Sequence, residues 1–182
     1  MNGDGFLIYF TADLHFYHNN AIKFANRPFR TVEQMNMALI DNWNNRVNPN
    51  DEIYVLGDFT MKGSALAAEI LCQLKGHKHL IKGNHDGFAD SVHFEKSLFE
   101  SISDYRQVNY MNTQFILFHY PILEWNQFFR GSIHLHGHQH NHADYNFRNL
   151  QNGVRRYDVG VDANNMRPVS ADEIIAFFSA LP

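Results

Sequence analysis

Short apolar runs alternate along the chain with longer segments in which apolar residues recur every three or four positions. Runs of four or five residues that are rich in β-branched or aromatic side chains, and that end at polar or glycine clusters, predict strands. The predicted strands are residues 7–11, 52–56, 78–81, 114–118, 133–136 and 157–161. The longer segments predict amphipathic helices. The predicted helices are residues 31–47, 64–75 and 170–181.

Two of these helices carry a recognisable start signal. Thr31 with Gln34, and Ser170 with Glu173, have the spacing of a capping box, in which the two side chains bind free main-chain N–H groups of the first turn. Residues 91–110 fit neither period, and we expect a helix or a loop there. Strands that alternate with helices indicate a layered α+β fold of α/β type, with sheet inside and helices outside.

Length and composition are those of an ordinary globular chain. The sequence has 182 residues, of which 45% are apolar and 19% charged, and no repeat or linker divides it, so we expect one domain over residues 1–182. We see no secretory-signal pattern and no apolar run of membrane-spanning length. The single cysteine, Cys72, fits a reducing cytoplasm, where we place the protein. The net charge of −4 argues against binding to extended nucleic acid.

Candidate chemistry is concentrated in short polar segments that follow predicted strands. These segments are Asp13-Leu14-His15, Gly57-Asp58, Gly83-Asn84-His85-Asp86, His119-Tyr120-Pro121 and Gly137-His138-Gln139-His140. Side chains just past strand ends converge in open α/β sheets, and glycines allow the main chain to turn and approach a ligand closely. We therefore expect these segments to form one site.

The residue types in these segments are those of a transition-metal site. The candidate ligands are Asp13, His15, Asp58, Asn84, His119, His138 and His140. Carboxylate, amide and imidazole donors together favour Mn, Fe, Zn or Ni over Ca or a thiolate-bound zinc. Seven ligands exceed the four of a tetrahedral zinc, so a bridging carboxylate would let them hold two ions. Two such ions generate hydroxide at neutral pH, stabilise charge on a phosphoryl group and attract an anionic substrate.

The same segments resemble the calcineurin-like metallophosphoesterases, and the resemblance extends over most of the chain, from Asp13 to His140. It implies a four-layer αββα sandwich in which two sheets pack together with helices outside. It also implies the following site: Asp13, His15 and His140 hold one ion, Asn84, His119 and His138 hold the other, Asp58 bridges them, and His85 protonates the leaving oxygen. The flanking sequence, including Val159-Gly160-Val161-Asp162, is similar to that of a small bacterial and phage branch of this family.

One position departs from many members of that family. Met61 stands where an acidic residue or a histidine orients the proton-donating histidine, so the arginine-containing signature of protein serine/threonine phosphatases is absent. This departure disfavours phosphoprotein substrates. It also leaves open what orients His85, because the adjacent Asp86 is a neighbour in sequence only.

Several further residues have two interpretations. His18 either faces the cleft and contacts phosphate or is a surface histidine, and Arg27 either clamps phosphate with both guanidinium edges or is a surface arginine before Pro28. His134, His136 and His142 extend the alternating histidine series. We expect these three to support the ligands or face solvent, since Gly137 interrupts the strand register.

The sequence thus predicts an enzyme, a dinuclear-metal phosphoester hydrolase, in which manganese is one candidate metal. Because the chain is small and lacks the phosphatase signature, we expect small phosphodiesters or nucleotide-like compounds as substrates. Three alternatives remain: a nuclease of the DNA-repair type, which would need a basic groove, a non-catalytic protein-binding scaffold, and a single structural zinc site. The oligomeric state does not follow from the sequence.

Overall fold

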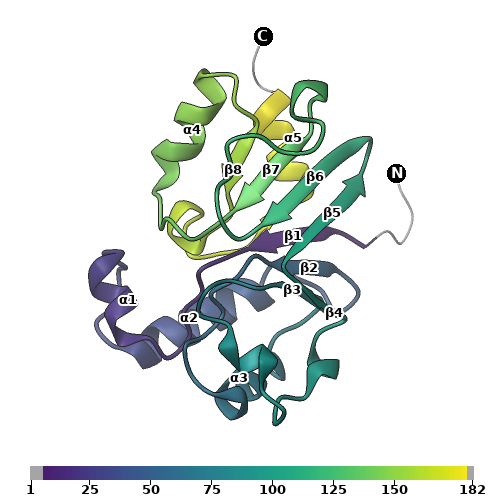
Figure 1. Ribbon diagram of the computed structural model, residues 1–182. Coiled ribbons are helices and arrows are strands. Elements are labelled where there is room, and N and C mark those ends of the chain that lie inside the picture. The colour runs from purple at the N-terminus through teal and green to yellow at the C-terminus, as the bar shows by residue number, and fades with distance from the viewer. Residues whose placement is uncertain (1–5, 180–182) are drawn as a thin grey trace.

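The computed structural model describes residues 6–179 and shows an α+β fold built on two mixed sheets with helices around them (Figure 1). The strands are β1 (Ile8–Thr11), β2 (Glu52–Val55), β3 (His77–Ile81), β4 (Ser101–Ser103), β5 (Tyr105–Tyr110), β6 (Thr113–Phe118), β7 (Ile133–His136), β8 (Arg156–Asp158) and β9 (Val169–Ser170). The helices are α1 (Asn19–Phe24), α2 (Val32–Asn44), α3 (Ser64–Leu71), α4 (Ala143–Gln151) and α5 (Ala171–Ser179). Among residues 6–179, no helix is both long and apolar enough to cross a membrane.

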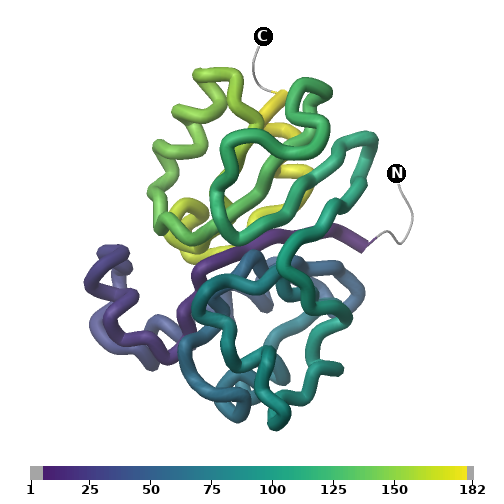
Figure 2. The backbone as a smooth tube through the Cα atoms, in the orientation of Figure 1, coloured from purple at the N-terminus to yellow at the C-terminus, as the bar shows by residue number. Residues whose placement is uncertain are grey.

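The two sheets share one design. The first has the strand order β4-β3-β2-β1-β9, with β1 to β4 parallel and β9 antiparallel to β1. The second has the order β5-β6-β7-β8, with β6 to β8 parallel and β5 antiparallel to β6. In the backbone tube, the purple strand β1 runs between the blue-teal half of the chain and the green-yellow half (Figure 2). Parallel strands from both sheets therefore carry their carboxyl ends toward one region.

Successive side chains along the strands of the first sheet point to opposite faces, and an apolar core lies on each face. In β1 and β2, Tyr9 and Ile53 point to one side and pack in the cluster that contains Trp43 of α2. Phe10 and Tyr54 point to the other side and join a second cluster with residues of β6, β7 and α5. The central strands β1 and β2 are thus buried on both faces, which holds their carboxyl ends rigidly.

The predicted elements are present, with ends that move by a few residues. The strand predicted at residues 133–136 is confirmed without change as β7, and the capping box of Ser170 and Glu173 is complete. The Ser170 hydroxyl accepts from the Glu173 N–H group at 3.1 Å, and the Glu173 carboxylate accepts from the Ser170 N–H group at 2.8 Å. The expectation for residues 91–110 is wrong in part, since β4 and β5 lie there. The last residues of the helix predicted to reach position 181 lie outside the described residues.

Candidate metal centre

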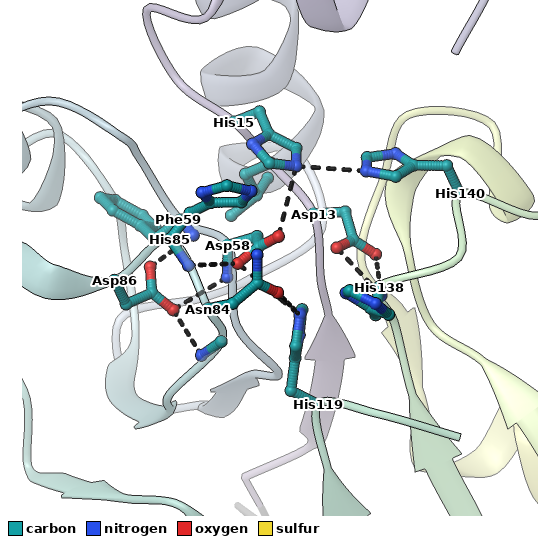
Figure 3. Close-up of polar contacts among 12 residues, drawn as sticks. Asp13, His15, Asp58, Phe59, Asn84, His85, Asp86, His119, His138 and His140 are labelled. Carbon is teal, nitrogen blue, oxygen red and sulfur yellow. Dashed lines mark hydrogen bonds and ion pairs between the residues drawn. The ribbon is translucent and has the colours of Figure 1, made fainter. Parts of the chain in front are cut away.

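The segments proposed from the sequence meet at the carboxyl ends of β1, β2, β3, β6 and β7 (Figure 3). Two main-chain hydrogen bonds join the first two segments: the Asp13 N–H group donates to the Gly57 carbonyl at 3.0 Å, and the His15 N–H group donates to the Asp58 carbonyl at 2.9 Å. Asp13, His15 and Asp58 each have a positive φ of 51–55°. Non-glycine residues rarely adopt this conformation, so the surrounding contacts hold these loops in place.

The ligand candidates form two clusters. Atoms of Asp13, His15 and His140 lie within 4.8 Å of one another, and so do atoms of Asp58, His119 and His138. Asp13, Asp58, His15 and His119 are buried, whereas His138 is exposed. The clusters therefore have a buried floor and an open side.

Asp58 lies between the two clusters (Figure 3). Its Oδ2 atom is 3.5 Å from His15 Nε2 in the first cluster, and its Oδ1 atom is 3.6 Å from His119 Nε2 in the second. One carboxylate thus offers one oxygen to each cluster, which is the arrangement that a bridging ligand needs.

Lone pairs converge in the second cluster. His119 Nδ1 donates to the Leu56 carbonyl at 2.7 Å, so Nε2 of the neutral ring carries a lone pair. Burial lowers the pKa of His119, which keeps that ring neutral. Its Nε2 atom faces the side-chain oxygen of Asn84 at 3.1 Å and the Asp58 carboxylate. Acceptors that point at one another without a donor fit a cation between them, so the residues present suit a bound metal ion.

Close packing around the carboxylates explains two of the glycines. A Cβ atom on Gly137 would lie 2.5 Å from Asp13 Oδ2, and one on Gly83 would overlap Asp58 Oδ1. The pKa of Asp13 is raised well above its usual range by burial and then by the charges of Asp158 and Asp58. A divalent cation beside Asp13 would offset this repulsion between carboxylates.

His15 is held neutral by its surroundings. Burial lowers its pKa to about 2, and the neighbouring His140 and Arg27 add to the effect. A neutral imidazole is the form that coordinates a metal ion.

His85 and Asp86 have different positions in the site. The His85 N–H group donates to Asp58 Oδ1 at 3.0 Å, and its ring centroid lies 5.6 Å from that of His15. The Asp86 carboxylate accepts from the N–H groups of Gly83, Asp58 and Phe59, each at 2.8 Å. Asp86 therefore fixes the main chain that carries Asp58 and Asn84. Among residues 6–179, the Asp86 carboxylate binds these three N–H groups and makes no hydrogen bond to the His85 ring.

His18 and Arg27 have different environments in the structure. His18 is half-buried with its ring centroid 5.3 Å from that of His15, beside the first cluster. The two sequence interpretations of Arg27 both need correction: its guanidinium is neither exposed nor open to phosphate. The side chain is fully buried and pairs with Asp162. Four protein oxygens accept its N–H groups, so none of these donors is left for a phosphate.

The extra histidines are structural. His134 donates from Nδ1 to the Ile116 carbonyl at 3.0 Å, and His136 donates from Nδ1 to the Gly137 carbonyl at 2.9 Å. Burial lowers the pKa of each to about 3. Both of these rings are buried. Of the three histidines expected to support the ligands or face solvent, only His142, which precedes α4, is exposed.

Two side chains at the site gave no functional signal in the sequence. Asp162 accepts from His140 Nδ1 at 2.7 Å, although it follows a valine-rich stretch that reads as a strand. Phe24, which is 54% exposed, lies at the rim with its ring centroid 4.9 Å from that of His140. A single exposed aromatic residue carries no pattern that sequence analysis can detect.

Comparisons with known proteins identify relatives along nearly the whole chain. No family model matches the sequence. The fold is similar to the crystal structure of a protein of unknown function, AQ665 from Aquifex aeolicus, with a TM-score of 0.72, 26% identity and coverage of 94% of this chain and 99% of that one. The Gene 66 protein of Mycobacterium phage L5 is 28% identical over an alignment of 193 positions, gaps included, which covers 91% of each chain.

A closer similarity shows the family. The uncharacterized protein MJ1445 of Methanocaldococcus jannaschii is 39% identical over 172 residues, which cover 92% of this chain and 89% of that protein. Similarity at this level over this length means that the chain belongs to the same family as MJ1445.

Proposed function

We propose that residues 1–182 form one calcineurin-like metallophosphoesterase domain that hydrolyses phosphoester bonds with two divalent metal ions. The observation that carries the proposal is the position of Asp58, with one carboxylate oxygen 3.5 Å from His15 and the other 3.6 Å from His119. The apolar cluster shared by β1, β6 and β7 supports the four-layer αββα arrangement. The substrates would be small phosphodiesters or nucleotide-like compounds in the cytoplasm.

Each cluster would hold one ion. Asp13, His15 and His140 form the first, and Asn84, His119 and His138 form the second, with Asp58 shared. When bound, Mn, Fe, Zn or Ni ions at these positions supply a nucleophile at neutral pH and stabilise the negative charge of the phosphoryl group.

The other groups of the chain would orient the reaction and move protons. His85 lies on the open side and would protonate the leaving oxygen, with its main chain held by Asp58 Oδ1. Asn84 is exposed at the rim, where its side-chain amide would contact both ion and phosphate. His18 would bind a phosphate oxygen from the other side of His15. Met61 is 47% exposed and has no charge, so it does not take the orienting role that an acidic residue has in many relatives.

Turnover of small phosphoesters tests the proposal. Metal-loaded wild type should hydrolyse bis-p-nitrophenyl phosphate or a member of a nucleotide panel. Asp58→Asn should be inactive because it removes the charge shared by both clusters, and His85→Ala should lose about 10²–10⁴-fold in rate while it retains metal. His93→Ala, which changes an exposed histidine, is the matched control and should be fully active.

Two outcomes would contradict the proposal, and a third would reassign the role of His85. If metal-loaded wild type turns over no compound in the panel, the result favours a protein-binding scaffold with this fold. If labelled single-stranded DNA is cleaved faster than small diesters, the result favours a nuclease. Loss of metal in His85→Ala would show that His85 is a ligand and not the proton donor.

A further inference from the structure

A buried ion pair lies directly behind the first cluster. Arg27 Nε is 2.8 Å from Asp162 Oδ1, and Arg27 Nη2 is 2.9 Å from Asp162 Oδ2, so the pair is bidentate. The side chains are 0% and 1% exposed. Removing two charges from water costs several kcal/mol per ion, which their attraction rarely exceeds, so stability alone is a weak reason for such a pair. Its contacts indicate a different role.

Arg27 holds the main chain of the first metal segment. Its Nη2 atom donates to the Asp13 carbonyl at 2.6 Å, and its Nη1 atom donates to the Leu14 carbonyl at 2.9 Å. Asp13 and His15 lie on either side of these carbonyls and have φ values of 55° and 51°. The guanidinium thus stabilises a main-chain conformation that L-residues disfavour and from which both ligand side chains project.

Asp162 holds the third ligand of the same cluster. Its Oδ2 atom accepts from His140 Nδ1 at 2.7 Å. A proton on Nδ1 leaves the lone pair on Nε2, which faces His15 Nε2 at 3.2 Å. Arg27 donates to both Asp162 oxygens, so the acceptor that orients the His140 ring is itself fixed in place.

The second cluster depends on other groups. The Asp58 loop is fixed by the Asp86 carboxylate, and the His119 ring is oriented by the Leu56 carbonyl. These contacts involve neither Arg27 nor Asp162. The two clusters thus have different main supports, and one link between them is the Asp13 carboxylate, which accepts from the His138 N–H group at 2.9 Å.

We infer that Arg27 and Asp162 are positioning residues that set the metal affinity of the first cluster and affect that of the second much less. The inference rests on the proposed two-metal function. Its consequence is that damage to this pair weakens the binding of one ion selectively, because Asp13, His15 and His140 lose their common support together.

Metal binding to the chelator-treated full chain tests the inference without activity. Titration with Mn²⁺, followed by calorimetry and by competition with a chelator, should show two ions in wild type. In Asp162→Asn, one ion should bind about 10–100-fold more weakly, since loss of a partner to a ligating histidine has that effect, and the affinity for the other should fall much less. Arg46→Gln breaks an arginine–glutamate pair that involves neither cluster and should leave both affinities unchanged.

Asp162→Asn leaves the Arg27 charge buried without its partner, so a second variant is needed. The double variant R27Q/D162N removes both charges and should show the same selective loss. Wild-type affinity for both ions in either folded variant would overturn the inference, as would equal weakening of both ions. Fewer than two ions in wild type would overturn the proposed function itself, and the inference with it.

A measurement on wild type does not depend on how the variants fold. Nitrogen-15 NMR of the His140 ring should show the proton on Nδ1 in the metal-free chain. A proton on Nε2 would mean that Asp162 does not orient this ligand, which overturns the inference.

Discussion

The Asp86 carboxylate provides a quantitative test of how the site is built. Asp86 is 1% exposed and accepts three main-chain hydrogen bonds at 2.8 Å, from the N–H groups of Gly83, Asp58 and Phe59. Asp86→Ala would leave these three donors without their acceptor. Each unsatisfied buried donor costs about 1–3 kcal/mol, so the sum is roughly 3–9 kcal/mol. The gain from no longer burying a carboxylate, which has a raised pKa because of burial, brings our expectation to about 3–5 kcal/mol.

Asp86→Asn gives a graded control. The amide has nearly the same shape and keeps one oxygen acceptor, but its NH₂ group faces at least one of the three main-chain N–H donors. We expect a loss of about 2–3 kcal/mol, between wild type and Asp86→Ala. Asp90→Asn changes a neighbouring carboxylate that is 68% exposed and pairs with Lys82, so its effect should stay within about 0.5 kcal/mol.

Urea unfolding of the metal-free chain, followed by circular dichroism at about pH 8, measures these losses with Asp86 ionised. An unchanged slope against urea would show that the variants alter the folded state and not the unfolded one. If Asp86→Ala unfolds at the same urea concentration as wild type, the three hydrogen bonds do not support the loop, and the account of how Asp58 is positioned is wrong.

Three further predictions concern stability. His134→Gln removes a buried histidine whose pKa burial lowers from 6.5 to about 3. Below pH 6.5 only the unfolded chain takes up this proton, so the stability of wild type should fall by about 1.4 kcal/mol per pH unit relative to the variant. A stability difference that does not depend on pH would refute this. Ser170→Ala should cost about 0.5–2 kcal/mol in urea unfolding, because the Glu173 N–H group at the start of α5 loses its acceptor; no loss would mean that the capping box does not stabilise the helix. Removal of metal by a chelator should lower the melting temperature by about 5–10 °C relative to protein in metal at 100 times its dissociation constant, which corresponds to about 2.7 kcal/mol, and an unchanged melting temperature would argue against a bound ion.

Strands and apolar helices were predictable because burial leaves a period in the sequence. β2 and the amphipathic α2 are examples, since Ile53, Tyr54 and Val55 form a buried apolar run, and the buried Met35, Leu39 and Trp43 recur every four residues. Helix α4 was missed because its buried face includes Asn146 and Asn149. Their side chains bind the main chain of Asp158 and Arg156 on the edge strand β8, so this helix packs through amides that apolar periodicity does not detect.

Strand β5 was missed for a different reason, which is the turn that follows it. It forms a hairpin with β6 through Met111 and Asn112, both with positive φ values of 46° and 62°. Such turns usually contain asparagine followed by glycine, so methionine followed by asparagine gives little sign of a turn.

The clustering of the candidate ligands was predictable, whereas their supports were not. Each candidate ligand follows a strand and belongs to a short motif, so residue type and position together single it out. The partner of Arg27 is Asp162, 135 residues away, and neither residue belongs to a motif with known chemistry. Only the folded chain brings the two together, which is why the sequence interpretations of Arg27 were limited to a surface or a phosphate contact.

The central claim is that two ions share the Asp58 carboxylate. Anomalous diffraction from crystals grown with Mn²⁺ tests it most directly, because it locates each ion without reference to activity. The account predicts two peaks about 3.5–4 Å apart, one beside His15 and His140 and the other beside His119 and His138. A single peak, or none next to Asp58, would contradict it.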